Sequence, residues 1–167
     1  MIIETHKSDT QDQIFFYEQD FYCLSNFSSF TLQWKGLRFD TSEATYHWEK
    51  FLTYESASIS ELEVIRKKIS LAPSAHEAFQ LSRKYKELVR PDWDNVKIDI
   101  MKEILWAKVK QHEYVRQKLV SSGNRQLIED SWRDDFWGWG PNKDGKNILG
   151  ELWMMIRGEL DNQNYIT

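Results

Sequence analysis

The stretch FDTSEATYHWEKF, residues 39–51, contains four regularly spaced side chains capable of acid–base or nucleophilic chemistry: Glu43, Tyr46, His47 and Lys50. Counted from Glu43, the other three come at i+3, i+4 and i+7, so a helix places all four on one narrow face. Glu43 and Lys50 then stand roughly 10.5 Å apart along the axis, and Lys50 leans back towards the helix N-terminus. This spacing predicts a carboxylate and an amine with room for a small ligand between them.

The helix that positions these groups has a start signal and an apolar stripe. Thr41 or Ser42 can cap it by accepting a backbone N–H bond, and the neighbouring stripe, which must face the core, consists of Ala44, Trp48 and Phe51. The alternative is a solvated face, because a Glu and a Lys at a helix boundary are usually exposed and inert. No second metal ligand stands at a recognisable spacing from His47, so we expect no metal site.

A glycine-rich loop, WGWGPNKDGKN at residues 137–147, is the second stretch whose residues could bind a substrate. It is not a P-loop, because Asn147 stands where that motif has a Ser or Thr after Gly-Lys, and no apolar strand precedes the loop. Its backbone N–H groups, with Lys143 or Lys146, can hold a phosphate, and Trp137 and Trp139 can stack on a base. The alternative is a long loop that two tryptophans pin onto the core.

The bulk composition restricts the class of protein. The 167 residues suit one domain, 1–167, with 1–13 as a loose N-terminal extension. A net charge of −4 gives no reason to expect bulk nucleic-acid binding.

The single cysteine, Cys23, suits a reducing compartment. No apolar run has the length of a signal peptide or a membrane span, so we expect a cytoplasmic protein without a membrane contact. We expect no cofactor.

The elements that carry these stretches follow from periodicity. Strands are expected at 14–18 and at 30–39, the latter with a turn near Gly36. After Asp40 the pattern is helical throughout, with helices near 42–54, 58–70, 74–87, 95–111, 112–121 and 148–161. The prediction is an α+β fold, a predominantly helical single domain with a small antiparallel sheet.

Seven short motifs occur in order along the chain. They are FFY, LSNF, TSEATYHWEKF, SR at 82–83, RPDWDNVK, MKEILWAKVKQH and WGWGPNKDGKNILGELWMMIR. In this order and spacing they resemble the YbiA-like, or NADAR, family, and the resemblance covers nearly the whole chain after about residue 14. Each motif alone is weak, whereas seven in the right order are specific.

The resemblance implies N-glycosidase chemistry on a small phosphorylated N-glycoside or an ADP-ribosylated base. Members act on early phosphorylated intermediates of riboflavin synthesis or remove ADP-ribose from guanine. The implied catalytic residues are Glu43, Lys50 and Asp134. The residues expected to bind substrate, some from the motifs and some from the phosphate-holding loop, are Asn26, Phe27, Tyr46, Arg83, Trp93, Trp137, Gly138, Lys146 and Asn147.

The sequence departs from the family pattern at four places. The His and Tyr that often follow the helix Glu are Ala44 and Thr45, the Gly before Arg83 is Ser82, and Pro141-Asn142 replaces smaller loop residues. These changes affect the pocket wall and loop shape, and so the substrate more than the reaction.

A mechanism fits the residue types. A neutral Lys50 attacks C1′, ring opening gives an imine, and water releases the sugar. Burial beside Trp48, Phe51 and Tyr54 would lower the pKa of Lys50. Glu43, near the helix N-terminus, serves as base or as the anion facing an oxocarbenium-like centre.

Three functions from different classes follow. They are an N-glycosidase of phosphorylated metabolites, an ADP-ribosyl glycohydrolase acting on guanine, and a non-catalytic ADP-ribose or NAD-binding module. Glu43 and Lys50 favour the two enzymes. Nothing in the residues indicates whether a toxin is paired with this protein.

Overall fold

The computed structural model describes residues 5–52, 54 and 58–164, with side chains as far as residue 162. The chain forms two compact units. Residues 1–25 and 112–167 make the terminal unit, and residues 26–111 make the middle unit. Helices dominate both units, and the strands are short, so the fold is α+β as the sequence predicts.

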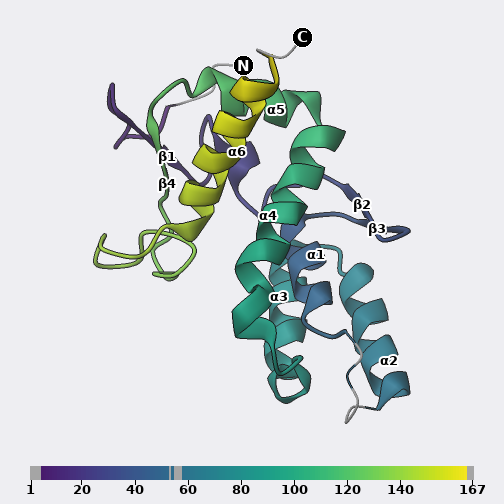
Figure 1. Ribbon diagram of the computed structural model, residues 1–167. Coiled ribbons are helices and arrows are strands. Elements are labelled where there is room, and N and C mark those ends of the chain that lie inside the picture. The colour runs from purple at the N-terminus through teal and green to yellow at the C-terminus, as the bar shows by residue number, and fades with distance from the viewer. Residues whose placement is uncertain (1–4, 53, 55–57, 165–167) are drawn as a thin grey trace. The chain divides into compact units, whose positions relative to one another are not determined.

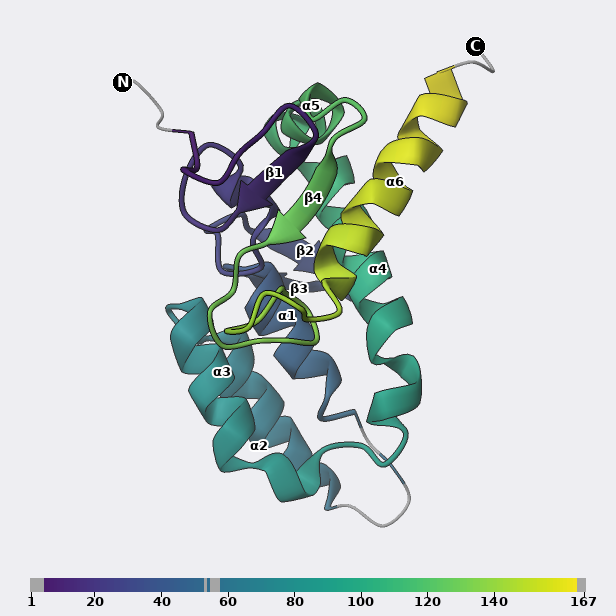
Figure 2. The same ribbon diagram turned by 90° about the vertical axis from the view of Figure 1, so that its left-hand side faces the viewer.

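The terminal unit is built on a parallel pair of strands. Strands β1 (Gln13–Phe16) and β4 (Gln126–Glu129) pair in register from Gln13 with Gln126 to Phe16 with Glu129. Figure 2 shows them side by side with helix α6 (Ile148–Asn164) next to β4. The 3-10 turn η1 (Tyr22–Leu24) contacts α5 (Glu113–Ser121). Trp153 of α6 is fully buried and donates its indole N–H to the Leu24 carbonyl, which ties the helix to η1.

The middle unit begins with a hairpin. Strands β2 (Leu32–Trp34) and β3 (Leu37–Phe39) are antiparallel, and Lys35 and Gly36 connect them with φ angles of 48° and 80°. A two-residue turn with positive φ at both positions matches the right-handed twist of the strands. The expected small antiparallel sheet with a turn at Gly36 is therefore confirmed.

Helix α1 (Ser42–Glu49) is the centre of the middle unit. It contacts both hairpin strands and the helices α2 (Ile59–Ser70), α3 (Ala75–Lys84) and α4 (Trp93–Gln111), which surround it in Figure 1. A further 3-10 turn, η2 (Lys86–Leu88), leads towards α4. Seven of the eight residues of α1 are buried, so its polar side chains are packed between neighbours on all sides.

The apolar core of the middle unit lies on one side of α1. The predicted stripe of Ala44, Trp48 and Phe51 packs there against α2, with Leu62, Ile65 and Ile69 as its main partners. Each of these six side chains is at most 4% exposed. The periodicity of the sequence therefore identified the buried face of α1.

Two expectations about the elements are wrong. The helix expected over 42–54 ends at Glu49, because the Lys50 amide already bonds in a tighter turn to the His47 carbonyl and the Lys50 carbonyl accepts a 2.8 Å bond from Arg90 N–H. Thr53 lies outside the described residues. The unbroken helical pattern after Asp40 is interrupted by β4, which carries only two consecutive apolar residues, Leu127 and Ile128, and forms because β1 is available beside it.

Candidate active site

The start of α1 is fixed by two backbone contacts. The Thr41 hydroxyl accepts a 3.1 Å hydrogen bond from Ala44 N–H, as a helix N-cap does. The Glu43 N–H donates a 3.1 Å bond to the Asn26 carbonyl. Since a free N–H of the first turn would otherwise be unsatisfied, Asn26 completes the cap with its backbone and sets the position of Glu43.

Glu43 and His47 form a hydrogen-bonded pair. His47 Nε2 lies 2.7 Å from Glu43 Oε1, and the side chains are 4% and 12% exposed. The alternative of a solvated face is therefore wrong. Burial is the main cause that lowers the pKa of His47, and Lys50 adds to it, while Glu43 opposes it. Nδ1 of His47 is buried without a hydrogen-bond partner in the described part of the chain, so a neutral ring with its proton on Nε2, donated to Glu43, fits best.

The amine of Lys50 lies against two aromatic rings. Its Nζ is 5.1 Å from the centre of the Tyr46 ring and 5.7 Å from that of Trp93 at the start of α4. The two rings are 4.9 Å apart and tilted by 59°. Tyr46 and Trp93 are 5% and 8% exposed. The rings that surround Lys50 are thus Tyr46 and Trp93 and not the expected Trp48, Phe51 and Tyr54, because Trp48 and Phe51 point into the core on another side of α1.

The pKa of Lys50 is lowered to about 8, and burial is the largest cause. Glu43 and Asp94 raise the pKa by attraction, and Lys97 lowers it further by repulsion. Lys97 is itself held by a 2.7 Å ion pair with Asp94 on α4. This second pair of charges was not predicted, although the i,i+3 spacing of Asp94 and Lys97 in the sequence is a signal for it.

Backbone hydrogen bonds hold Lys50 and Trp93 in a fixed relation. The Lys50 carbonyl accepts from Arg90 N–H at 2.8 Å, and the Arg90 carbonyl accepts from Trp93 N–H at 3.1 Å. The Arg90 side chain closes this turn through two 2.6 Å bonds to Asp92. The motif RPDW thus positions the indole over the amine, a role for Arg90 that the sequence did not reveal.

The other predicted site residues of the middle unit are Arg83, Asn26 and Phe27. Arg83 on α3 is exposed, with its guanidinium carbon 5.8 Å from the centre of the Phe79 ring, and Phe79 in turn contacts His47. Its guanidinium makes no hydrogen bond or ion pair within the described ranges. Asn26 is buried and donates to the Met101 sulfur, whereas Phe27 is 51% exposed.

The predicted residues of the terminal unit shape the glycine-rich loop. Asp134 Oδ1 accepts bonds of 2.9 and 2.7 Å from the amides of Phe136 and Trp137. Gly138 fits so tightly that a Cβ would lie 2.7 Å from the Ser131 Cβ. The Asn147 side chain bonds to the backbone of β4 through both its oxygen and its nitrogen.

Lys146, like Lys143, is an exposed cation of this loop, and its Nζ lies 5.4 Å from the Phe136 ring centre. One face of the Trp139 ring stacks on Phe15, with the ring centres 5.0 Å apart. Cys23 is fully buried, so its thiol has no access to a substrate. Among the described residues no group of three or more His, Cys, Asp or Glu side chains could hold a metal ion, and no helix there is long and apolar enough to cross a membrane.

Known proteins resemble this chain in both sequence and fold. The chain is 36% identical over 151 residues to an N-glycosidase of Nostoc punctiforme, covering 89% of this chain and 93% of that protein. It is 33% identical over 157 residues to a riboflavin biosynthesis protein of Vibrio vulnificus, covering 92% of this chain but 40% of that longer protein. The solution structure of Escherichia coli YbiA matches with a TM-score of 0.80 and 28% identity, over 99% of this chain and 96% of that one.

The family model described as the NADAR domain matches residues 15–161, which include every residue of the cluster around Glu43 and Lys50. The match spans both units and agrees with the order of motifs in the sequence. The chain belongs to the NADAR domain family.

Proposed function

We propose that this chain is an N-glycosidase that hydrolyses the base–ribose bond of small phosphorylated N-glycosides of the riboflavin-precursor type. The relatives named above support the reaction class and the substrate type. The observation that carries the proposal is the amine of Lys50, half-buried against Tyr46 and Trp93 on the same helix face as the Glu43 carboxylate.

The lowered pKa of Lys50 makes the amine a usable nucleophile. With a pKa of about 8, about one molecule in ten carries a neutral amine at pH 7. An ordinary lysine with a pKa of 10.5 provides only about three in ten thousand. The gain of roughly 300-fold in reactive amine comes from the surroundings of Lys50, without any cofactor.

The first step forms a covalent intermediate. The Lys50 nitrogen bonds to C1′ of the sugar while the bond from C1′ to the base nitrogen breaks, and the base leaves with the bonding electrons and takes up a proton. The attacking nitrogen loses a proton, and the sugar ring then opens at O4′ to give an imine between C1′ and Nζ. Water adds to the imine carbon and Lys50 leaves as the neutral amine, so the products are free base and sugar phosphate.

Glu43 serves the same sequence as a carboxylate. Positive charge grows at C1′ as the base departs, and a carboxylate on the same helix face stabilises it. The carboxylate then accepts the proton of the attacking water as general base. His47 holds Glu43 in place through the 2.7 Å bond and is a positioning residue, since its other ring nitrogen is buried.

The exposed Arg83 is suited to the substrate phosphate, because its guanidinium has no hydrogen-bond or ion-pair partner among the described residues and can pair with two phosphate oxygens. Trp93 is suited to stacking on the base. The roles predicted for Asn26, Phe27, Tyr46, Asp134, Trp137, Gly138, Lys146 and Asn147 remain predictions. The hydrogen bonds of Asp134 and Asn147 nevertheless favour a part in holding the loop over direct contact with substrate.

A turnover assay with three substrates tests the proposal. Purified protein is incubated with the first pyrimidine ribotide of riboflavin synthesis, with ADP-ribosylated guanosine or with NAD, and products are identified by mass spectrometry. Release of base and ribose phosphate from the ribotide is expected. Turnover of ADP-ribosylated guanosine alone would identify the other enzyme class, and binding without turnover would identify a binding module.

Borohydride trapping tests the covalent step. Reduction during turnover is expected to add the sugar phosphate to the peptide that contains Lys50. The Lys50→Ala variant should show no adduct and no turnover, and the control Lys110→Ala, at an exposed lysine beside Trp106, should behave as the wild type. Full activity of Lys50→Ala would exclude the covalent step. Full activity of Glu43→Gln would exclude a catalytic role for this face of α1.

A further inference from the structure

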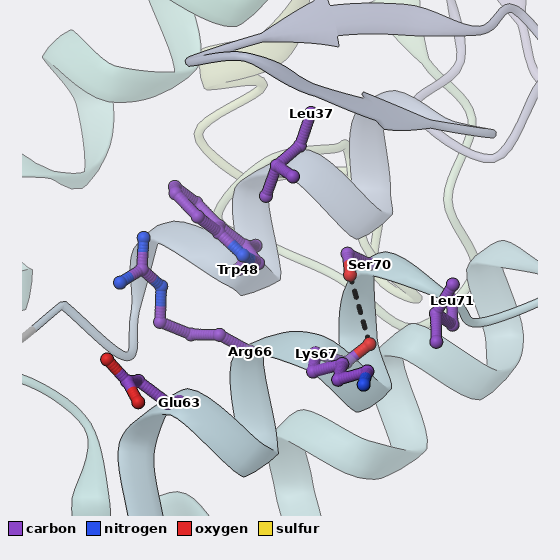
Figure 3. Close-up of a pocket in the computed structure, with 7 residues that line it drawn as sticks. All are labelled: Leu37, Trp48, Glu63, Arg66, Lys67, Ser70 and Leu71. Carbon is purple, nitrogen blue, oxygen red and sulfur yellow. Dashed lines mark hydrogen bonds between the residues drawn. The ribbon is translucent and has the colours of Figure 1, made fainter. Parts of the chain in front are cut away.

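A hollow of about 480 Å³ lies in the middle unit, between the hairpin, α1 and α2. Its volume is within the range of small-molecule pockets, about 300–1,000 Å³. The residues that line it are Leu37, Trp48, Glu63, Arg66, Lys67, Ser70 and Leu71. Figure 3 shows Arg66 reaching from α2 towards Trp48 on α1, with Leu37 of β3 directed at the same indole.

This hollow is separate from the face of α1 that carries Glu43 and Lys50. Trp48 follows Glu43 by five residues and precedes Lys50 by two, which places it roughly 150° around the helix from that face at 3.6 residues per turn. The residues that line the hollow do not include Lys50 or its neighbours Glu43, Tyr46, His47 and Trp93. The N-glycosidase proposal therefore assigns nothing to it.

Among the described residues, no group of opposite charge forms an ion pair with the guanidinium of Arg66. It stacks on Trp48 with its central carbon 3.7 Å from the ring centre. Its Nε is buried, and over residues 5–52, 54 and 58–164 the group makes no hydrogen bond or ion pair. Burial is the main cause that lowers the pKa of Arg66. Burying a donor of a charged group without an acceptor costs free energy, so the site favours an added acceptor.

The acidic groups nearby are engaged elsewhere or exposed. Glu49 Oε1 accepts a 2.5 Å bond from the Trp34 indole and forms a 2.8 Å ion pair with Lys35, and its Oε2 is buried without a hydrogen-bond partner among the described residues. Glu49 and, less strongly, the exposed Glu63 attract Arg66 through space, but neither forms an ion pair with it within the described ranges. Two cations, Arg66 and Lys67, and one carboxylate, Glu63, line the hollow, so its own charge is positive and suits an anion.

The remaining wall is apolar and accessible. Leu37 is 42% exposed and Leu71 is 70% exposed, high values for leucines that line a hollow. The Ser70 hydroxyl is turned to the Lys67 carbonyl at 3.0 Å, as the dashed line in Figure 3 marks. An occupant that satisfies the whole lining needs an acidic group at one end and a flat or apolar body at the other.

We propose that this hollow binds a small organic anion, with a carboxylate or phosphate on the Arg66 guanidinium and an apolar ring over Leu37 and Leu71. The planar fork of arginine can pair with two oxygens of such a group. The site is independent of the reaction at Lys50, so either proposal can fail without the other.

An NMR titration tests this site with phenyl phosphate as the probe. The background is the double variant Glu43→Gln, Lys50→Ala, which removes the two groups of the proposed reaction. The Arg66 Nε–H and Trp48 indole N–H signals are expected to shift together at millimolar probe. Inorganic phosphate and phenol, which carry only the acid or only the ring, should bind at least about ten-fold more weakly.

Matched arginine variants decide the role of Arg66. Arg66→Gln should weaken phenyl phosphate binding at least about ten-fold, and Arg66→Lys should lose less. The control Arg116→Gln makes the same change at an exposed ion pair with Glu113 and should bind as the background does. Unchanged signals of Arg66 and Trp48 in the background protein, or unchanged affinity in a folded Arg66→Gln, would overturn the proposal.

Discussion

Nε2 of His47 lies 2.7 Å from Oε1 of Glu43, one turn earlier on the same short helix, and both side chains are largely buried. The pair connects the chemistry of the site to the packing of α1. Phe79 and Tyr46 hold the imidazole at ring distances of 5.8 and 5.4 Å, so the carboxylate is oriented by a ring that cannot turn away freely.

His47→Phe should lower kcat by about ten-fold, because the carboxylate loses its donor while the ring volume remains. KM should change less than about two-fold, because the variant misplaces a group of the chemical step and not the substrate. Steady-state kinetics measures both constants. His47→Gln, which keeps a donor, should restore much of the rate, and the exposed His76→Phe serves as control; an unchanged kcat in His47→Phe, or no recovery in His47→Gln, would refute the positioning role.

Activity should rise with pH and level off above about 8, the pKa to which burial lowers Lys50. The neutral amine is the reactive form, and its fraction grows as pH increases through that value. The measurement is kcat/KM against pH, which reports groups of the free enzyme. A profile that stays flat from pH 6 to about 9 would contradict the role of Lys50 as nucleophile.

Lys50→Met should be more stable than the wild type at neutral pH by about 2 kcal/mol. A lowering from 10.5 to about 8 corresponds to roughly 3 kcal/mol, from which the lost contacts with the Tyr46 and Trp93 rings, about 0.5 kcal/mol each, are subtracted. Between about pH 8 and 10.5 the folded protein releases the Lys50 proton, whereas the unfolded chain still holds it. The free energy of unfolding of the wild type therefore rises across this window, and the advantage of Lys50→Met shrinks. Urea unfolding of both proteins at several pH values measures this; a constant difference across that window would disagree with it.

Arg83→Gln should raise KM for a phosphorylated substrate by about ten-fold with little change in kcat, because the exposed guanidinium binds phosphate in substrate and transition state alike. The same variant should leave KM for the dephosphorylated substrate unchanged. Steady-state kinetics on both substrates give the comparison. Arg38→Gln, at an exposed ion pair with Asp40, is the control, and equal effects on both substrates would exclude phosphate recognition by Arg83.

Gly150→Ala should destabilise the protein strongly, by about 3 kcal/mol or more. A Cβ at Gly150 would lie 2.1 Å from the Leu127 carbonyl of β4, so helix and strand would have to separate. The matched control is Gly158→Ala in the same helix, where no atom lies within 4 Å. That change should stabilise by about 0.5–1 kcal/mol, the difference in helix propensity. Urea unfolding measures both; similar values for the two variants would reject the close approach.

The sequence determined the features that depend on local rules. Period and capping predicted α1 with Glu43 and Lys50 beside a buried stripe, and the Gly36 turn predicted the hairpin. Local contacts settle these features, because the residues involved lie within one or two turns of each other. The seven motifs, taken in order, also identified the family that the comparisons establish.

Only the tertiary structure decided which groups surround the amine. Trp93 reaches Lys50 because Arg90 bonds to the carbonyl that ends α1, and β4 forms because β1, 113 residues away at Gln13 and Gln126, offers it a parallel partner. Burial changes the protonation of Lys50 and His47, and burial is a property of all the elements packed around α1. The sequence therefore predicted the pair that we propose to react, whereas packing between distant segments lowers the pKa of its amine.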